Sequence, residues 1–170
     1  MIERPMAPRM ALAVLGVLGT LNSLYLALQR WFPASTAPLK CGVVGDCAVV
    51  QASQYSQFPP GNGIPVAYLG LAGFAVMLLL SLLLLSRDRL GALPLPPILL
   101  GFATLGLAFS GYLTAIEAFV LHEWCQWCIV SASLMLVFWA LALLDWRLWR
   151  RGDADSGDDE FSQANAVAEG

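Results

Sequence analysis

Four cysteines are the residues of this 170-residue chain whose type and spacing could do chemistry. Cys125 and Cys128 form a C-x-x-C motif, and five residues, two of them glycine, separate Cys41 from Cys47. A thiolate attacks a disulfide through a mixed-disulfide intermediate, so two pairs within reach of each other can pass oxidation between them. The four cysteines therefore predict a thiol–disulfide relay.

The C-x-x-C motif lies at the start of a segment that we expect to be helical. A spacing of three residues puts Cys125 and Cys128 on one helical face. The unpaired amides of a helix N-terminus favour thiolate over thiol. We expect Cys125 to lie nearer the solvent and Cys128 nearer the hydrocarbon. This order suits transfer from a water-borne reductant to a lipid-dissolved oxidant.

Two other interpretations of the cysteines stay open. Two structural disulfides would brace an exposed loop, although a lipid boundary is an unusual place for a C-x-x-C that serves only as a brace. A tetrathiolate zinc site fits the count of four. However, the Cys41–Cys47 spacing exceeds the usual ~2–4 intervening residues, and an oxidising compartment opposes zinc binding. We expect no metal.

Composition indicates a membrane protein. The chain is 58% hydrophobic and 12% charged, with a mean hydropathy of +0.69, whereas soluble domains carry about 25% charged residues. Four apolar segments are long enough, at ~20 residues, to cross a bilayer as helices. They span residues 10–29, 66–86, 98–121 and 125–144. The predicted fold is an all-α integral membrane four-helix bundle over residues 1–151, with a long first outer loop.

Basic residues predict the orientation of the bundle. Seven of the nine basic residues flank the segments on one side: Arg4, Arg9, Arg87, Arg89, Arg147, Arg150 and Arg151. The positive-inside rule puts this side, with both termini, in the cytoplasm. All four cysteines then face the extracytoplasmic side of the cell membrane. The first apolar segment exceeds the ~7–15 residues of a signal-peptide core, so we expect it to be an anchor and not a cleaved signal.

The segments outside the bundle differ in character. The loop 31–64 is rich in proline and glycine, and a short interfacial helix is expected within residues 48–58. The tail, residues 152–170, holds six of the twelve acidic residues and is predicted to be disordered. The sequence has no basic stripe interleaved with aromatics, so nucleic acid is not an expected partner.

Over residues 10–147 the chain resembles the vitamin K epoxide reductase family, in particular its bacterial disulfide-forming members. The family pattern is four transmembrane helices, a cysteine pair and a serine or threonine in the first loop, and C-x-x-C opening the last helix. Here these are Cys41 with Cys47, Ser53, and Cys125 with Cys128. The G-I-P-V run at 63–66 and the N-S-L-Y run at 22–25 are similar too. The quinone-coupled membrane oxidant of other bacteria has its C-x-x-C in the first loop, so the motif order favours the first family.

The resemblance implies roles by position. Cys128 would face a membrane quinone, menaquinone or ubiquinone, and would pair with Cys125 in the resting oxidised state. Cys41 would transfer electrons to Cys125, and Cys47 would form the mixed disulfide with the partner. Ser53 would hydrogen-bond in the quinone pocket. The implied function is reoxidation of a thioredoxin-like (DsbA-like) protein, which drives disulfide formation in exported proteins.

Two features modify what the resemblance implies. The vertebrate enzymes have a tyrosine four residues after the second helix cysteine, whereas this chain has Ala132, which favours simple quinone reduction over epoxide chemistry. Many members carry a fused thioredoxin-like domain. The sequence leaves no room for one after Leu148, so we expect a separate partner.

Other residues keep alternative interpretations. Glu117, near the outer end of the third segment, would either handle protons or have a snorkelling or capping role at the helix end. His122 is either a solvated turn residue or an acid–base aid to Cys125. Four aromatic residues would line a ring-binding pocket or pack as core: Phe58, Tyr68, Phe74 and Phe109. A non-enzymatic alternative for the whole chain is a tetraspan scaffold braced by structural disulfides.

Overall fold

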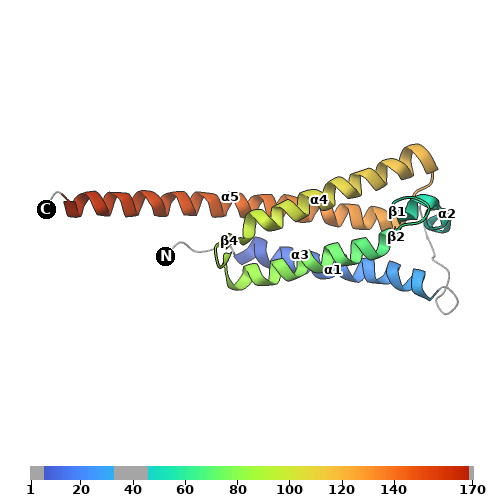
Figure 1. Cartoon of the computed structure of the whole chain (residues 1–170), viewed down its shortest axis with the longest axis horizontal. Coiled ribbons are helices and arrows are strands. Elements are labelled where there is room, and N and C mark those ends of the chain that lie inside the picture. Colours follow the sequence, from blue (N-terminus) through green and yellow to red (C-terminus); the bar gives the residue numbers. More distant parts are fainter. Residues whose placement is uncertain (1–5, 33–45, 169–170) are drawn as a thin grey trace.

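The protein is an elongated bundle of four long helices, as the computed structural model shows (Figure 1). The structure describes residues 6–32 and 46–168, with side chains to residue 152. The long helices are α1 (Met6–Trp31), α3 (Val66–Ser86), α4 (Leu95–Ile116) and α5 (Gln126–Ala168). Each is apolar over a length that crosses a membrane. The predicted all-α four-span fold is confirmed, and the chain is a multi-pass membrane protein.

Short elements connect the helices. At the end of the bundle that holds the cysteines lie α2 (Cys47–Ala52), η1 (Gln54–Ser56) and the hairpin of β1 (Gln57–Phe58) with β2 (Ile64–Pro65). The expected short helix in this loop is therefore present, although it is only six residues long. At the opposite end, β3 (Arg89–Leu90) and β4 (Leu93–Pro94) form a second hairpin. Its tight turn contains Gly91, whose φ of 64° is accessible to glycine without strain.

Helix α1 packs on α3 and α5, and α4 packs on α5. The buried core runs along these contacts and includes Leu12, Phe74, Leu99 and Phe138. At Gly19 the ring of Phe74 lies so close that a Cβ would overlap it, so α1 and α3 approach as they do only because this residue is glycine. The start of α1 and the end of α5 lie at the end of the bundle opposite α2 (Figure 1).

A buried ionic cluster ties three elements together at this opposite end. Arg9 of α1 contacts Asp145 of α5 at 2.9 Å and Asp88 of the α3–β3 connection at 2.6 Å. It also donates a hydrogen bond to the carbonyl of Leu84. Arg9 and Asp145 are 3% and 1% exposed. Buried charges are stable only when paired, so the cluster holds α1, α3 and α5 in register.

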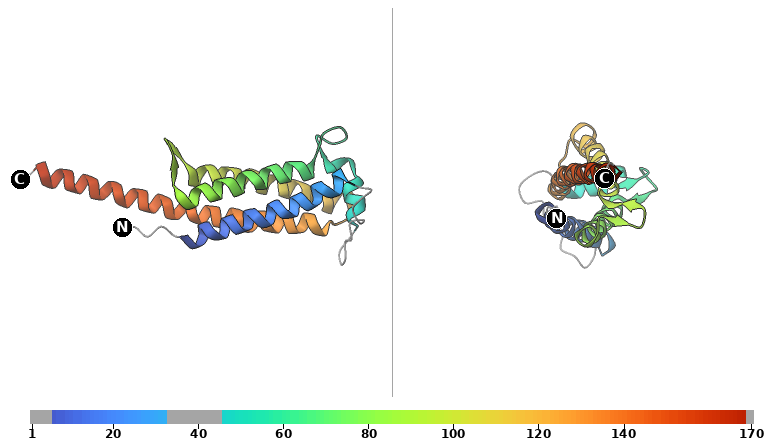
Figure 2. Two further views of the ribbon diagram at one scale, coloured as in Figure 1. Left: turned by 90° about the horizontal axis from the view of Figure 1, so that it is seen from below. Right: turned by 90° about the vertical axis from the view of Figure 1, so that its left-hand side faces the viewer.

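The structure differs from expectation at two helix boundaries. Helix α4 begins at Leu95, three residues earlier than predicted, because Pro96 and Pro97 fit in the first turn, where their missing amides are not needed. Helix α5 does not end near residue 144 but continues to Ala168, beyond the other helices (Figure 2). Residues 152–168, which we expected to be disordered, are therefore helical in the structure. The segment has no proline to end the helix and includes good helix formers such as alanine.

Candidate functional site

Three of the four cysteines lie at one end of the bundle. Cys47 is the first residue of α2, and Asp46 caps the N-terminus of this helix. The carboxylate of Asp46 accepts hydrogen bonds from the amides of Ala48 and Val49 at 2.9 and 3.4 Å. Cys47 is disulfide-bonded and 1% exposed. It packs with Val50 and Cys125 in one buried cluster. The fourth, Cys41, lies outside the described residues.

Cys125 and Cys128 stand at the start of α5, and both are free thiols. The structure therefore describes the form in which the helix pair is reduced, whereas the resemblance implies a disulfide between them at rest. The two side chains hydrogen-bond each other, as their shared helical face predicts. The order with Cys125 nearer the solvent and Cys128 nearer the hydrocarbon stays a prediction about depth in the membrane, but the Cys125 side chain is not open to solvent. Cys125 is 0% exposed because α2 covers it, while Cys128 is half-buried.

The surroundings of Cys125 favour its thiolate. The hydrogen bond from the Cys128 side chain is the largest effect that lowers the pKa of Cys125 below its ordinary value, and the backbone amides of Cys128 and Trp127 act in the same direction. Burial and the nearby carboxylate of Glu117 oppose this shift without cancelling it. Of the two helix cysteines, Cys125 is therefore the one poised to exchange with another disulfide.

We expect the reduced protein to show one thiolate that forms below the ordinary thiol pKa of about 8.5. Titration of the ultraviolet thiolate absorbance in detergent measures this, with Cys125→Ser as the reference that lacks the signal. Cys128→Ala should move the midpoint upward, because the Cys128 side chain provides the largest stabilisation. Because the pKa of Cys125 is lower in the folded protein than in the unfolded chain, ionisation of this thiol stabilises the reduced fold at pH values above the pKa in the unfolded chain. This stabilisation is lost as the pH falls through the pKa of Cys125 in the folded protein. A midpoint at or above 8.5 in the parent protein would contradict the assignment.

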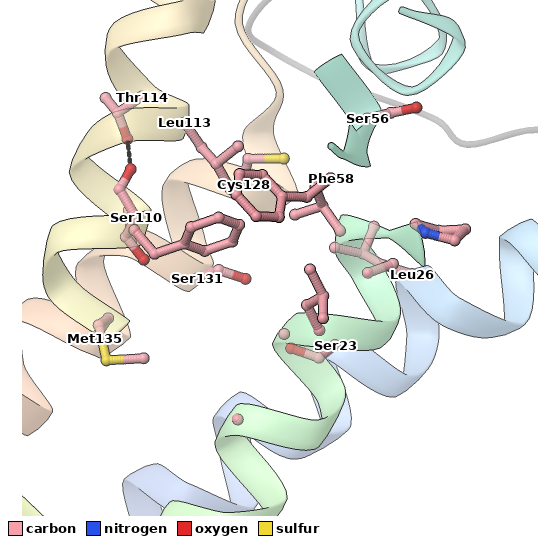
Figure 3. Close-up of a pocket in the computed structure, with 18 of the residues that line it drawn as sticks. Ser23, Leu26, Ser56, Phe58, Ser110, Leu113, Thr114, Cys128, Ser131 and Met135 are labelled. Carbon is pink, nitrogen blue, oxygen red and sulfur yellow. Dashed lines mark hydrogen bonds between the residues drawn. The ribbon is translucent and has the colours of Figure 1, made fainter. Parts of the chain in front are cut away.

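A cavity of about 620 Å³ lies between the helices directly beside the cysteines. Its wall is mostly apolar and includes Phe58, Phe74 and Phe109, whereas Tyr68 instead contacts Trp31. Figure 3 shows Cys128 and Ser131 on α5, with Ser23 and Leu26 on the opposite side. Cys128 is on the wall of this cavity, and Cys125 is not among the lining residues. The second cysteine of the motif thus faces the cavity, and the first faces α2.

Several of the polar side chains that line the cavity are hydrogen-bonded. Ser53 lines the cavity at the end of α2, where its hydroxyl donates to the carbonyl of Val50 at 2.7 Å. Asn22 donates to the Ser131 hydroxyl at 2.6 Å and to the carbonyl of Trp127 at 3.4 Å. These bonds fix the first turns of α5 against α1, which orients Cys128. The sequence contained a signal for this: Asn22 and Ser131 are polar residues within apolar segments.

The turn between α4 and α5 brings an acid to the cysteines. The last residues of the third span form a π-helical turn, η2 (Glu117–Leu121), and His122 follows in the left-handed region with φ of 54°. Glu117 is 5% exposed, lines the cavity, and accepts a hydrogen bond from the amide of Cys125 at 3.1 Å. This burial does not fit a side chain that snorkels to water, whereas the hydrogen bond to the amide of Cys125 fits the predicted capping role. His122 is exposed and shapes the chain reversal through its backbone.

The arrangement supports stepwise exchange of disulfides toward an apolar cavity. A disulfide-bonded cysteine contacts a thiolate-prone one, and the thiol next to it lines a space of ligand size. In the described residues no group of three or more histidine, cysteine or acidic side chains is arranged to hold a metal ion. In a comparison with known families, the family model described as the Vitamin K epoxide reductase family matches residues 10–143.

Proposed function

The chain belongs to the vitamin K epoxide reductase family, whose members are oxidoreductases, and from this premise we propose that it is a membrane thiol–quinone oxidoreductase. It takes electrons from the dithiol of a thioredoxin-like protein and passes them to a membrane quinone, menaquinone or ubiquinone. The observation that carries the proposal is the burial of Cys47 against Cys125, with Cys128 of the same motif on the cavity wall.

The cavity suits a quinone ring. Its volume lies within the ~300–1,000 Å³ typical of small-molecule sites, and its apolar wall carries aromatic side chains beside a few polar groups. Phe58 and Phe109, which contact each other edge to face with ring centroids 5.7 Å apart, would pack against the ring. Ser53 lies on the same wall, as its proposed hydrogen-bonding role requires. Ala132, also on the wall, offers no phenolic donor, which supports simple quinone reduction rather than epoxide chemistry.

In the proposed route, two electrons and two protons move together at each exchange. The dithiol of the partner reduces a loop disulfide between Cys41 and Cys47 through a mixed disulfide on Cys47. Because Cys47 is 1% exposed, this step requires α2 to move away from Cys125 and open Cys47 to the partner. Cys41 then attacks the Cys125–Cys128 disulfide at Cys125, and attack of Cys47 on Cys41 releases Cys125. The loop disulfide is restored and the helix pair is left as a dithiol. Oxidation of this dithiol reduces quinone to quinol.

The proposed setting is the cell membrane, with both ends of the chain in the cytoplasm and the cysteines outside. Arg9, Arg87, Arg89, Arg147 and Arg150 lie at the end of the bundle away from α2, as the positive-inside rule requires of a cytoplasmic face. An oxidising exterior also suits a cysteine that is disulfide-bonded. In this orientation the protein would sustain disulfide formation in exported proteins.

The test is reconstitution of the full chain in liposomes with a reduced thioredoxin-like protein and a short-chain ubiquinone. We expect quinol to form in a 1:1 ratio to the disulfide of the partner, and trapping with a gel-shift thiol reagent should show both cysteine pairs changing state. A tetraspan scaffold with structural disulfides would give no quinol and unchanged cysteines under all conditions. That result would sink the proposal.

A further inference from the structure

Glu117 is a buried acid that the route above does not use. It lies within the third membrane-spanning segment, where an ionisable side chain is costly and is seldom present without a task. Of the charged residues in the described part of the chain, only Glu117 and Arg30 line the cavity. Arg30 approaches the backbone of Gln51, at 3.4 Å from its carbonyl, whereas Glu117 lies beside the helix cysteines.

The Glu117 carboxylate touches both members of the C-x-x-C motif. One oxygen accepts the hydrogen bond from the amide of Cys125 at 3.1 Å, and the carboxylate also interacts with the thiol of Cys128. The π-helical turn that contains Glu117 and the reversal at His122 bring the carboxylate back onto the start of α5. Such turns recur at functional sites. The acid therefore borders the two sulfur atoms and the cavity at once.

A purely structural role explains only part of this geometry. A side-chain acceptor at the start of α5 satisfies one amide that the helix leaves unpaired, and a neutral glutamine would serve equally well. A permanently ionised carboxylate, in contrast, repels the thiolate that Cys125 is otherwise set up to form. The two charges are compatible if the carboxyl group holds a proton when Cys125 is ionised.

Building on the proposed function, we propose that Glu117 is the catalytic proton carrier of the helix dithiol: it takes the proton of Cys125 and delivers it to the quinone. Before transfer the site holds the Glu117 carboxylic acid, the Cys125 thiolate and the Cys128 thiol. Two electrons leave the sulfur atoms as the Cys125–Cys128 bond forms. One proton comes from Cys128 and one from Glu117, which together convert quinone to quinol and leave the carboxylate. The net charge of −1 is the same before and after the step.

Glu117→Gln in the full chain isolates this role, because glutamine keeps the acceptor for the Cys125 amide and carries no transferable proton. With the helix pair reduced and a short-chain ubiquinone added, we expect the single-turnover rate of quinol formation to fall about 100-fold at neutral pH, within the usual range for loss of a general acid. The dependence of that rate on pH should also change shape. Glu117→Asp, which retains the proton, should recover part of the rate.

Two controls separate proton transfer from folding. Glu123→Gln removes the same charge from the neighbouring turn and should leave the rate unchanged. The thermal unfolding midpoint of Glu117→Gln in detergent should match that of the parent protein, because glutamine keeps the acceptor for the Cys125 amide. If the parent reduces ubiquinone and Glu117→Gln matches it at every pH, this inference is wrong and the proposed function stands. If the parent itself forms no quinol, both are overturned.

Discussion

Replacing Cys128 with serine is expected to abolish quinol formation, with a loss of at least about 10³-fold, as removal of a covalent catalytic group typically gives. Cys128 is the only cysteine among the residues that line the cavity in the described part of the chain. Without it the helix cannot close its own disulfide, and two electrons cannot leave as a pair. The measurement is quinol absorbance in the reconstituted system with a reduced thioredoxin-like protein.

The same variant should accumulate a trapped intermediate. Cys125 is buried against Cys47, so once its own partner is gone it should remain bonded to a cysteine of the 41–47 loop. Peptide mass spectrometry under non-reducing conditions would detect this link. Cys125→Ser is the matched control: it should lose quinol formation to a similar degree and form much less of the cross-link, because its remaining thiol faces the cavity. Persistent turnover in Cys128→Ser would refute the assignment of the quinone-facing thiol.

The fold could be predicted well because lipid imposes simple requirements on sequence. A spanning helix needs a long apolar run, and the run at 66–86 coincides with α3 as observed. Prediction failed where lipid does not decide the structure. The extension of α5 past residue 152 leaves the apolar segment, and composition alone indicates disorder for an acidic, small-residue tail.

The candidate site could be predicted only in part. The C-x-x-C spacing determined that Cys125 and Cys128 share a face, but not which of them is exposed. Cys125 is buried because α2 lies over it, and that contact joins residues far apart in the sequence. The hydrogen bond between Glu117 and Cys125 could not be predicted from the sequence either, because it depends on a π-helical turn and on the left-handed backbone of His122. Neither leaves a periodic pattern that a sequence displays.

Under the proposed function, these contacts would separate two tasks that a single thiol could not perform. Exchange with the loop requires a thiolate next to another disulfide, and Cys125 has both the lowered pKa and the contact with Cys47. Reduction of an apolar oxidant requires a sulfur on the wall of an apolar space, where Cys128 lies. The burial of Cys125 also keeps water and small oxidants from its sulfur. The position of the cavity thus predicts that the two halves of the reaction can be blocked independently.

Gly73→Phe tests this separation. Gly73 of α3 lines the cavity, and a Cβ added there would meet no atom within 4 Å, so a larger side chain can leave the helix at this position toward the cavity. We expect the KM for quinone to rise about 10- to 100-fold, equivalent to about 1–3 kcal/mol of lost binding, because the substituted ring competes for the same volume. The initial rate of quinol formation against quinone concentration measures this.

Exchange among the cysteines should survive in Gly73→Phe, because the contact between Cys47 and Cys125 lies outside the cavity. The reduced partner should therefore still convert the helix disulfide to a dithiol at the parent rate, as thiol trapping without quinone would show. Gly101→Phe is the matched control: it adds the same ring to an exposed position of α4 with open space around it, and should leave the KM unchanged. An unchanged KM in Gly73→Phe would mean that quinone binds elsewhere, and a loss of thiol exchange would mean that the two tasks share one site.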